Sequence, residues 1–341
     1  MNKKKLNEVA ITTNNNEYVI ALDLGKFEGK AIGKRKFDVS EDIKQVKIRT
    51  KMKELNENEY IEIGENSYNL VYENKNIIVG ENGVEAEDNY STSKTTNMHK
   101  YIAYTIITRF LEPNTTNNKI QIVLACPISV LKIQGAKENY KKMIKGEGII
   151  KIIVNGQKFE FEITDIMVKT EDSCIINTNE LKNKNNIGIV GIGGLNMNYL
   201  QYINGDFVVK TSYEHGSSVL DNYIKDDLTV FLNGNIPNDN DIYMASNNGY
   251  ICRKGEKVKE SETIINCSKK RFLQDMNVLL AKDKIDLSNL QNLIFIGGTS
   301  IKLKNQIKEL YPNIIELENE EDYQMLAVIG LYRVAFKKYC K

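Results

Sequence analysis

The sequence predicts an α/β protein built from two halves of similar plan. Three observations lead to this prediction. Short, continuous apolar runs recur along the chain, a glycine-bearing loop follows such a run once in each half, and segments of helical periodicity lie between them. Apolarity that is continuous rather than alternating is typical of strands covered on both faces, as in parallel sheets.

Four apolar runs are the predicted buried strands, and each ends in a turn. The runs are residues 18–22, 120–125, 187–190 and 293–296, and the turns that follow begin at Asp23, Cys126, Gly191 and Gly297. Asn-Gly pairs at 155–156 and 204–205 predict two hairpins, because this pair favours the type I′ turn.

Five segments show helical spacing of apolar residues. They are the stretch from Pro127 to Ile144 and residues 217–232, 268–280, 301–310 and 322–338. The last carries lysines in its final turn, which suit the negative end of a helix dipole.

A chain of 341 residues is long enough for two domains. We expect domain I at residues 17–175, completed by a C-terminal helix at 322–341, and domain II at residues 176–321. Residues 1–16 are expected to form a flexible polar tail.

Composition excludes several functional classes. Forty-six basic and 45 acidic residues give a net charge of +1, so we expect no direct contact with nucleic acid. Five scattered cysteines and two histidines form no zinc pattern, and free thiols fit a reducing cytoplasm. No run of 18 apolar residues and no apolar stretch behind the N-terminus are present, so we expect neither a membrane span nor a signal peptide.

The first glycine loop runs from Asp23 to Lys30 and joins two strand-like segments. In a P-loop or a Rossmann turn the glycines open a helix instead. Gly25 can let backbone N–H groups approach phosphate oxygens, Asp23 can organise waters around Mg²⁺, and Lys30 can add a positive charge. An ordinary strand turn is the alternative interpretation.

The second glycine loop repeats this plan in the other half. It follows the strand at 187–190 and reads Gly191-Ile192-Gly193-Gly194-Leu195-Asn196. Gly193 and Gly194 can bring backbone donors to a phosphate.

Three further segments are candidates for the same site. Gly297-Gly298-Thr299 precedes a helix and suits close approach of a nucleoside, although a plain turn has the same pattern. Gly216 and Ser217 can cap a helix, which makes the adjacent His215 an incidental neighbour. Glu171 ends a predicted strand, where it is either a catalytic acid or half of a solvated acidic pair with Asp172.

Together these loops resemble the superfamily of actin, the heat-shock chaperones and the sugar kinases. The first loop is similar to its Asp-x-Gly-x-x-x-x-Lys pattern, and residues 122–127 resemble its first connecting segment. The second loop resembles Asp-x-Gly-Gly, except that Gly191 stands in the place of the Asp. Chain length and the Leu195-Asn196 pair are most similar to the ParM-like bacterial actins of plasmid segregation, especially clostridial ones.

The resemblance implies the actin-like ATPase fold, with two similar α/β domains flanking a nucleotide cleft. ATP or GTP would bind there with Mg²⁺, which Asp23 would hold through water. Asp23 and Glu171 would be catalytic. The implied nucleotide-binding residues are Asp23, Gly25, Lys30, Gly193, Gly194, Leu195, Asn196, Gly216, Ser217, Gly297, Gly298 and Thr299.

The implied activity is polymerisation of the chain with itself into a filament that hydrolyses its nucleotide. A DNA-binding adaptor protein bound to a plasmid centromere would attach the filament to DNA. A second hypothesis is a nucleotide-binding structural polymer with little or no hydrolysis, because Gly191 replaces the usual carboxylate. A small-molecule kinase would need a carboxylate base beside a substrate pocket, and no motif for one is seen.

Overall fold

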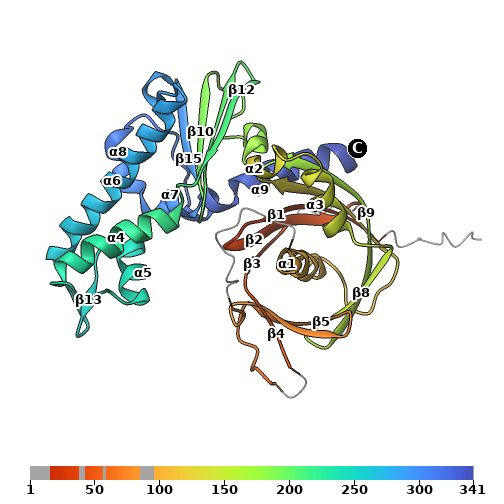
Figure 1. Ribbon diagram of the computed structural model, residues 1–341. Coiled ribbons are helices and arrows are strands. Elements are labelled where there is room, and N and C mark those ends of the chain that lie inside the picture. The colour runs from red at the N-terminus through yellow and green to blue at the C-terminus, as the bar shows by residue number, and fades with distance from the viewer. Residues whose placement is uncertain (1–15, 38–42, 57–58, 85–95, 341) are drawn as a thin grey trace, which may run out of the picture.

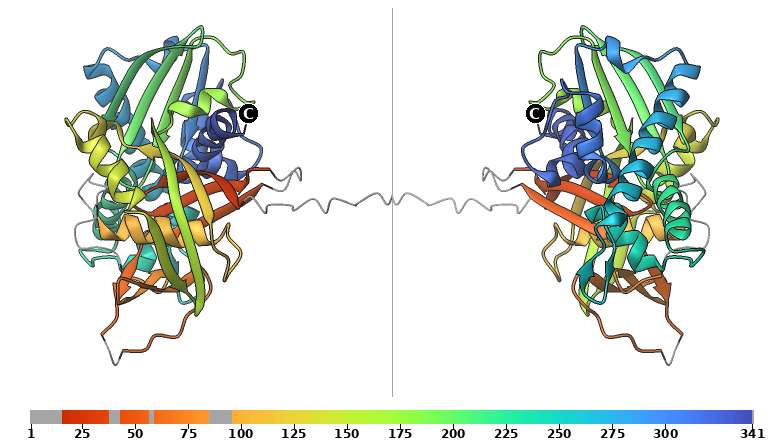
Figure 2. Two further views of the ribbon diagram at one scale, coloured as in Figure 1. Left: turned by 90° about the vertical axis from the view of Figure 1, so that its right-hand side faces the viewer. Right: turned by 90° about the vertical axis from the view of Figure 1, so that its left-hand side faces the viewer.

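A computed structural model of the chain describes residues 16–37, 43–56, 59–84 and 96–340. Figure 1 shows two α/β bodies side by side, and Figure 2 shows them from two further directions. The predicted tail at residues 1–16 lies outside the described residues, apart from Asn16.

The first half is a large mixed sheet with the strand order β3-β2-β1-β7-β9-β8-β5-β6-β4. Its strands are β1 (Glu17–Leu24), β2 (Glu28–Arg35), β3 (Lys44–Arg49), β4 (Met52–Glu54), β5 (Ser67–Tyr72), β6 (Lys75–Gly80), β7 (Asn118–Cys126), β8 (Ile149–Val154) and β9 (Gln157–Thr170). The sheet curves around helix α1 (Asn97–Thr108), whose side chains join its main apolar core (Figure 1). Helices α2 (Ile128–Leu131) and α3 (Ala136–Lys145) connect β7 to β8.

The centre of this sheet is parallel and covered on both faces. Strand β1 pairs in parallel with β7, and β7 pairs in parallel with β9. In β1, Ile20 and Leu22 pack into the core around α1, whereas Val19 and Ala21 pack on the opposite face against helix α9 (Glu320–Tyr339). This two-sided burial explains why the run at 18–22 is continuously apolar.

The second half has a four-stranded sheet with the order β12-β11-β10-β15. Its strands are β10 (Ile187–Ile192), β11 (Met197–Ile203), β12 (Asp206–Tyr213) and β15 (Asn292–Ile296), and its helices are α4 (Ser217–Phe231), α5 (Asp239–Asn248), α6 (Glu260–Lys282), α7 (Gly298–Lys302) and α8 (Lys304–Leu310). A short ribbon, β13 (Cys252–Arg253) with β14 (Glu256–Lys257), precedes α6, and the 3₁₀ helix η2 (Leu287–Asn289) follows it. The core on one face of this sheet includes side chains from α4 and α6.

The C-terminal helix α9 returns to the first half of the chain. Val328, Leu331 and Ala335 pack with Val19 and Ala21 of β1, and Cys174 of the 3₁₀ helix η1 (Ser173–Asn177) belongs to the same cluster. Near its start, Tyr323 and Leu326 pack instead with residues of the second sheet. The predicted boundary between residues 175 and 176 falls inside η1 and stays a prediction.

The four predicted strands and both predicted hairpins are present. Asn155 and Gly156 have φ of +51° and +76°, and Asn204 and Gly205 have φ of +52° and +85°, as a type I′ turn requires. Two predicted helices are each interrupted, the first at Gly135 (φ +77°) between α2 and α3 and the other at Leu303 between α7 and α8. Within the described ranges, no helix has the length and apolar character needed to cross a membrane.

Candidate functional site: five loops that meet at the second glycine loop

The first glycine loop is the turn between β1 and β2. Asp23 and Lys30 face each other across this antiparallel pair. A Cβ on Gly25 would lie 2.6 Å from the Glu28 carbonyl oxygen, so the turn accepts only glycine here without a backbone shift. Thr50 holds the turn in place, because its hydroxyl donates to the Gly25 carbonyl oxygen at 2.6 Å and its N–H donates to the Phe27 carbonyl oxygen at 3.0 Å.

The second glycine loop is the turn between β10 and β11. The Gly193 N–H donates to the Asn196 carbonyl oxygen at 2.9 Å, which closes the turn. The two glycine loops approach each other, since a Cβ on Gly194 would lie 3.9 Å from the Cβ of Phe27. The structure thus brings together the two loops that lie about 170 residues apart in the sequence.

The start of α4 is bound to this second loop. The N–H groups of Ser217 and Ser218 donate to the carbonyl oxygens of Gly193 and Gly194 at 2.9 and 3.0 Å. A Cβ on Gly216 would lie 2.5 Å from the Leu195 carbonyl carbon, so glycine is required for this contact.

The Gly-Gly-Thr segment after β15 closes the site from another side. Strand β15 runs parallel to β10, so the carboxyl ends of both strands lie at one edge of the sheet, where ligands commonly bind in α/β folds. The buried Thr299 hydroxyl donates to the Gly193 carbonyl oxygen at 2.9 Å. Gly297 has φ +90°, and a Cβ there would lie 2.4 Å from the Ile192 carbonyl oxygen, whereas a Cβ on Gly298 would meet only Gln324 at 3.8 Å.

Two lysines beside these loops, the buried Lys269 and the partly buried Lys302, were not predicted. Lys302 donates to the Ser217 hydroxyl at 2.9 Å and lies 3.8 Å from the Asp221 carboxylate. Burial lowers the pKa of Lys302, and burial together with the charge of Lys302 lowers the pKa of Lys269 on α6 to about 8. Two desolvated ammonium groups within electrostatic reach of each other favour the binding of an anion on this side of the site. In the sequence, Lys269 differs from the apolar residues beside it only in being a lysine on the buried face of α6.

The acidic segment after β9 lies against the end of β7 and the strand pair that carries the second glycine loop. The Glu171 N–H donates to the Cys126 carbonyl oxygen at 2.9 Å, which ties the segment to the end of β7. The carboxylate of Asp172, which the sequence does not single out as a site residue, contacts the strand pair that carries the second loop. It accepts a hydrogen bond from the Asn198 side chain at 2.9 Å. Burial and the charge of Glu171 raise the pKa of Asp172 to about 7.

His215 is buried, stacked on Phe272 with ring centroids 4.0 Å apart, and its Nε2 lies 2.9 Å from the Phe272 carbonyl oxygen. Burial lowers its pKa, so the ring is neutral at pH 7 and its role is in packing.

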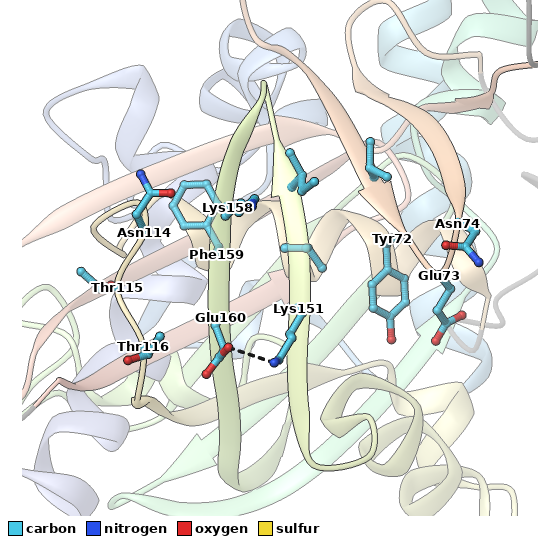
Figure 3. Close-up of a pocket in the computed structure, with 13 residues that line it drawn as sticks. Tyr72, Glu73, Asn74, Asn114, Thr115, Thr116, Lys151, Lys158, Phe159 and Glu160 are labelled. Atoms are coloured by element: carbon cyan, nitrogen blue, oxygen red, sulfur yellow. Dashed lines mark ion pairs between the residues drawn. The ribbon is translucent and has the colours of Figure 1, made fainter.

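A groove of about 560 Å³ lies elsewhere, on strands β5, β8 and β9 (Figure 3). Lys151 and Glu160 form an ion pair of 3.4 Å in it. None of its lining residues belongs to the glycine loops, so the groove is separate from the candidate site. Among the described residues, no three His, Cys, Asp or Glu side chains are placed to hold a metal ion together.

Comparison with known proteins identifies the family. The N-terminal domain model of the actin-like proteins matches residues 21–171. The Alp12 filament structure is 41% identical, with a TM-score of 0.70, over 95% of this chain and 100% of that chain. A 15-stranded ParM filament from Clostridium botulinum is 17% identical, with a TM-score of 0.71, over 94% and 99%. Bacillus thuringiensis ParM with ATP is 12% identical, with a TM-score of 0.64, over 96% and 100%. The comparison with curated proteins gives no match.

The identity of 41% with the Alp12 protein, over nearly the whole of both chains, establishes common descent and the fold. The chain therefore belongs to the actin-like proteins, among the ParM-like bacterial actins. The predicted fold class and family resemblance are confirmed.

Proposed function

We propose that this chain binds ATP or GTP with Mg²⁺ between its two halves and polymerises in the cytoplasm into filaments that move plasmid DNA. The observation that carries the proposal is the convergence on the second glycine loop. The Gly193 carbonyl oxygen accepts hydrogen bonds from both Ser217 and Thr299, and the first loop reaches Gly194.

The residues present fit a magnesium nucleotide. At Gly193, Gly194 and Gly298 an added Cβ would meet no protein atom closer than 3.5 Å apart from the chain neighbours, so space is left beside their backbone for a ligand. Asp23 and Lys30, paired across β1 and β2, would face the phosphates, with Asp23 accepting hydrogen bonds from water on Mg²⁺. Bound Mg²⁺ would neutralise phosphate charge, and Glu171 would orient the attacking water.

The nucleoside would lie against Gly297, Gly298 and Thr299. Gly298 leaves room for it, because a Cβ there would meet only Gln324. Lys302 and Lys269 would supply positive charge beside the start of α4, and a bound anion would stabilise their charged forms.

Self-assembly is supported by the relatives. The Alp12 protein, at 41% identity, is known as a filament, and so is the C. botulinum ParM. A net charge of +1 favours an adaptor protein as the link to a plasmid centromere, since the chain has no overall basic character.

The alternative is a polymer that binds nucleotide and hydrolyses little of it. Gly191 favours it, because the second loop has no carboxylate of its own.

Sedimentation and negative-stain microscopy with Mg²⁺ and ATP, GTP or no nucleotide test the proposal, with phosphate release measured in the same samples. We expect filaments only with nucleotide, and phosphate release that follows assembly. Filaments that form without phosphate release over hours would support the alternative. Identical sedimentation in all three samples would refute nucleotide-dependent assembly.

A further inference from the structure

The position of the missing side chain at Gly191 is already filled. A Cβ built on Gly191 would lie 2.5 Å from Oδ2 of Asp172 and 3.1 Å from its Cγ. The Asp172 carboxylate therefore stands where a side chain of the second loop would begin. The two residues lie on different elements, since Gly191 is in β10 and Asp172 precedes η1.

The Asp172 carboxylate is held in this place from the second loop's own hairpin. Asn198, which donates to Oδ2 of Asp172 at 2.9 Å, is the residue that pairs with Gly191 between β10 and β11. Asn198 is buried, with 7% of its surface exposed. This hydrogen bond fixes the carboxylate against the strand pair that carries the loop.

The backbone around Asp172 is also fixed. Asp172 has φ +61°, a left-handed conformation that Asp tolerates better than most residues. On either side, the Glu171 N–H donates to the Cys126 carbonyl oxygen and the Ser173 carbonyl oxygen accepts from the Tyr202 hydroxyl at 2.8 Å. The carboxylate is thus a built feature of the junction between the halves.

The charged groups around Asp172 show which part of the candidate site it lies near. Burial raises the pKa of Asp172 most, the charges of Glu171 and Asp23 raise it further, and the charge of Lys30 lowers it, so the first loop's charged pair lies within electrostatic reach. Asp172 therefore lies within reach of the charged pair that is proposed above to face the phosphates and the metal.

We propose that Asp172 supplies, from the segment that joins the two halves, the carboxylate that the second glycine loop lacks. This inference rests on the proposed function. With a magnesium nucleotide bound, Asp172 joins Asp23 as an acceptor for metal-bound water. Gly191 is then glycine because Asp172 needs its space, and its presence no longer argues for a polymer without hydrolysis.

The test uses Asp172→Gly, Gly191→Asp and the double variant Gly191→Asp/Asp172→Gly. Glycine suits the left-handed backbone at 172 while removing the carboxylate. Asn183→Gly is the matched control, because Asn183 is exposed and has φ +67°. Two quantities are measured for each chain: the thermal midpoint without ligand, and the Mg²⁺ concentration that half-saturates the stabilisation by ATP.

We expect Asp172→Gly to raise the half-saturating Mg²⁺ concentration about tenfold or more, as loss of groups that orient a metal does, with Asn183→Gly like the parent. Gly191→Asp should lower the ligand-free midpoint, because its side chain collides with Asp172. The double variant should recover both quantities, which a pair of independent sites would not do.

An unchanged Mg²⁺ requirement in Asp172→Gly, in a parent that binds Mg²⁺ and ATP, would overturn this inference alone. Purely additive effects in the double variant would do the same. A parent that binds no magnesium nucleotide would overturn the proposed function as well.

Discussion

A methyl group added at Gly297 should destabilise the fold, whereas one added at the adjacent Gly298 should weaken nucleotide binding. Gly297 has φ +90° and ψ 162°, a region that is nearly restricted to glycine. Gly298 has no such constraint and no neighbour within 3.8 Å of an added Cβ. Alanine at position 297 would therefore strain the backbone, whereas alanine at position 298 would place its methyl group in the proposed nucleoside site.

The magnitudes follow from these geometries. Backbone strain of this kind costs about 1–3 kcal/mol, and the contact of 2.4 Å with the Ile192 carbonyl oxygen adds to it. With roughly 2–4 °C per kcal/mol for a domain of this size, the backbone strain alone should make Gly297→Ala melt about 2–12 °C below the parent, and the close contact should add to this loss. Gly298→Ala should leave it equal or slightly higher, because alanine restricts the unfolded chain.

Calorimetry without nucleotide measures the change in melting temperature, and titration of each variant with ATP measures the change in affinity. Gly298→Ala should raise the Kd for ATP about tenfold, or about 1.4 kcal/mol, because its Cβ occupies space next to the nucleoside. A melting temperature of Gly297→Ala equal to that of the parent would refute backbone strain at this position. An ATP affinity of Gly298→Ala equal to that of the parent would contradict the placement of the nucleoside against this loop.

Three further variants probe other parts of the site. Thr299→Val keeps the shape of a buried side chain but removes its hydrogen bond to the Gly193 carbonyl oxygen. Unfolding in urea should therefore show a free energy of unfolding about 1–3 kcal/mol lower than that of the parent. A loss below about 0.5 kcal/mol would show that this hydrogen bond does not stabilise the contact between the loops. Lys269, with a folded pKa of about 8 and a usual value of 10.5, binds fewer protons folded than unfolded between these pH values. Stability should therefore rise from pH 8 to 10.5 by up to about 3 kcal/mol, and Lys269→Met should remove this rise; a parent without it would show that the lysine is not desolvated. Asp23→Ala should abolish nucleotide-dependent sedimentation at limiting Mg²⁺, and sedimentation equal to the parent's would count against Asp23 as the metal-organising carboxylate.

Sequence patterns predicted the strands next to the site because burial on both faces and Asn-Gly turns leave local signals. They place a helix between the first hairpin and β7 but give no bounds for α1, because all of its residues except Asn97 and Lys100 are buried and no polar face marks a helical period. The break at Gly135 was also missed, since the apolar spacing continues through it.

Within the site, the sequence predicted the glycines but not the groups that meet them. Asp172 and Gly191 are 19 positions apart, and only the left-handed turn at Asp172 and the pairing of β10 with β11 bring the carboxylate to the glycine. Lys269 and Lys302 come within electrostatic reach of each other through the packing of helices, which no local pattern encodes. In the sequence only register distinguishes Glu171 from its neighbour Asp172, and the catalytic role of Glu171 stays a prediction.

A structure determined with Mg²⁺ and a non-hydrolysable ATP analogue tests the central claim most directly. The account predicts phosphates between Gly25 of the first loop and Gly193 and Gly194 of the second, and the nucleoside against Gly298. A nucleotide bound in the separate groove beside Lys151, or bound with its phosphates away from both glycine loops, would contradict it.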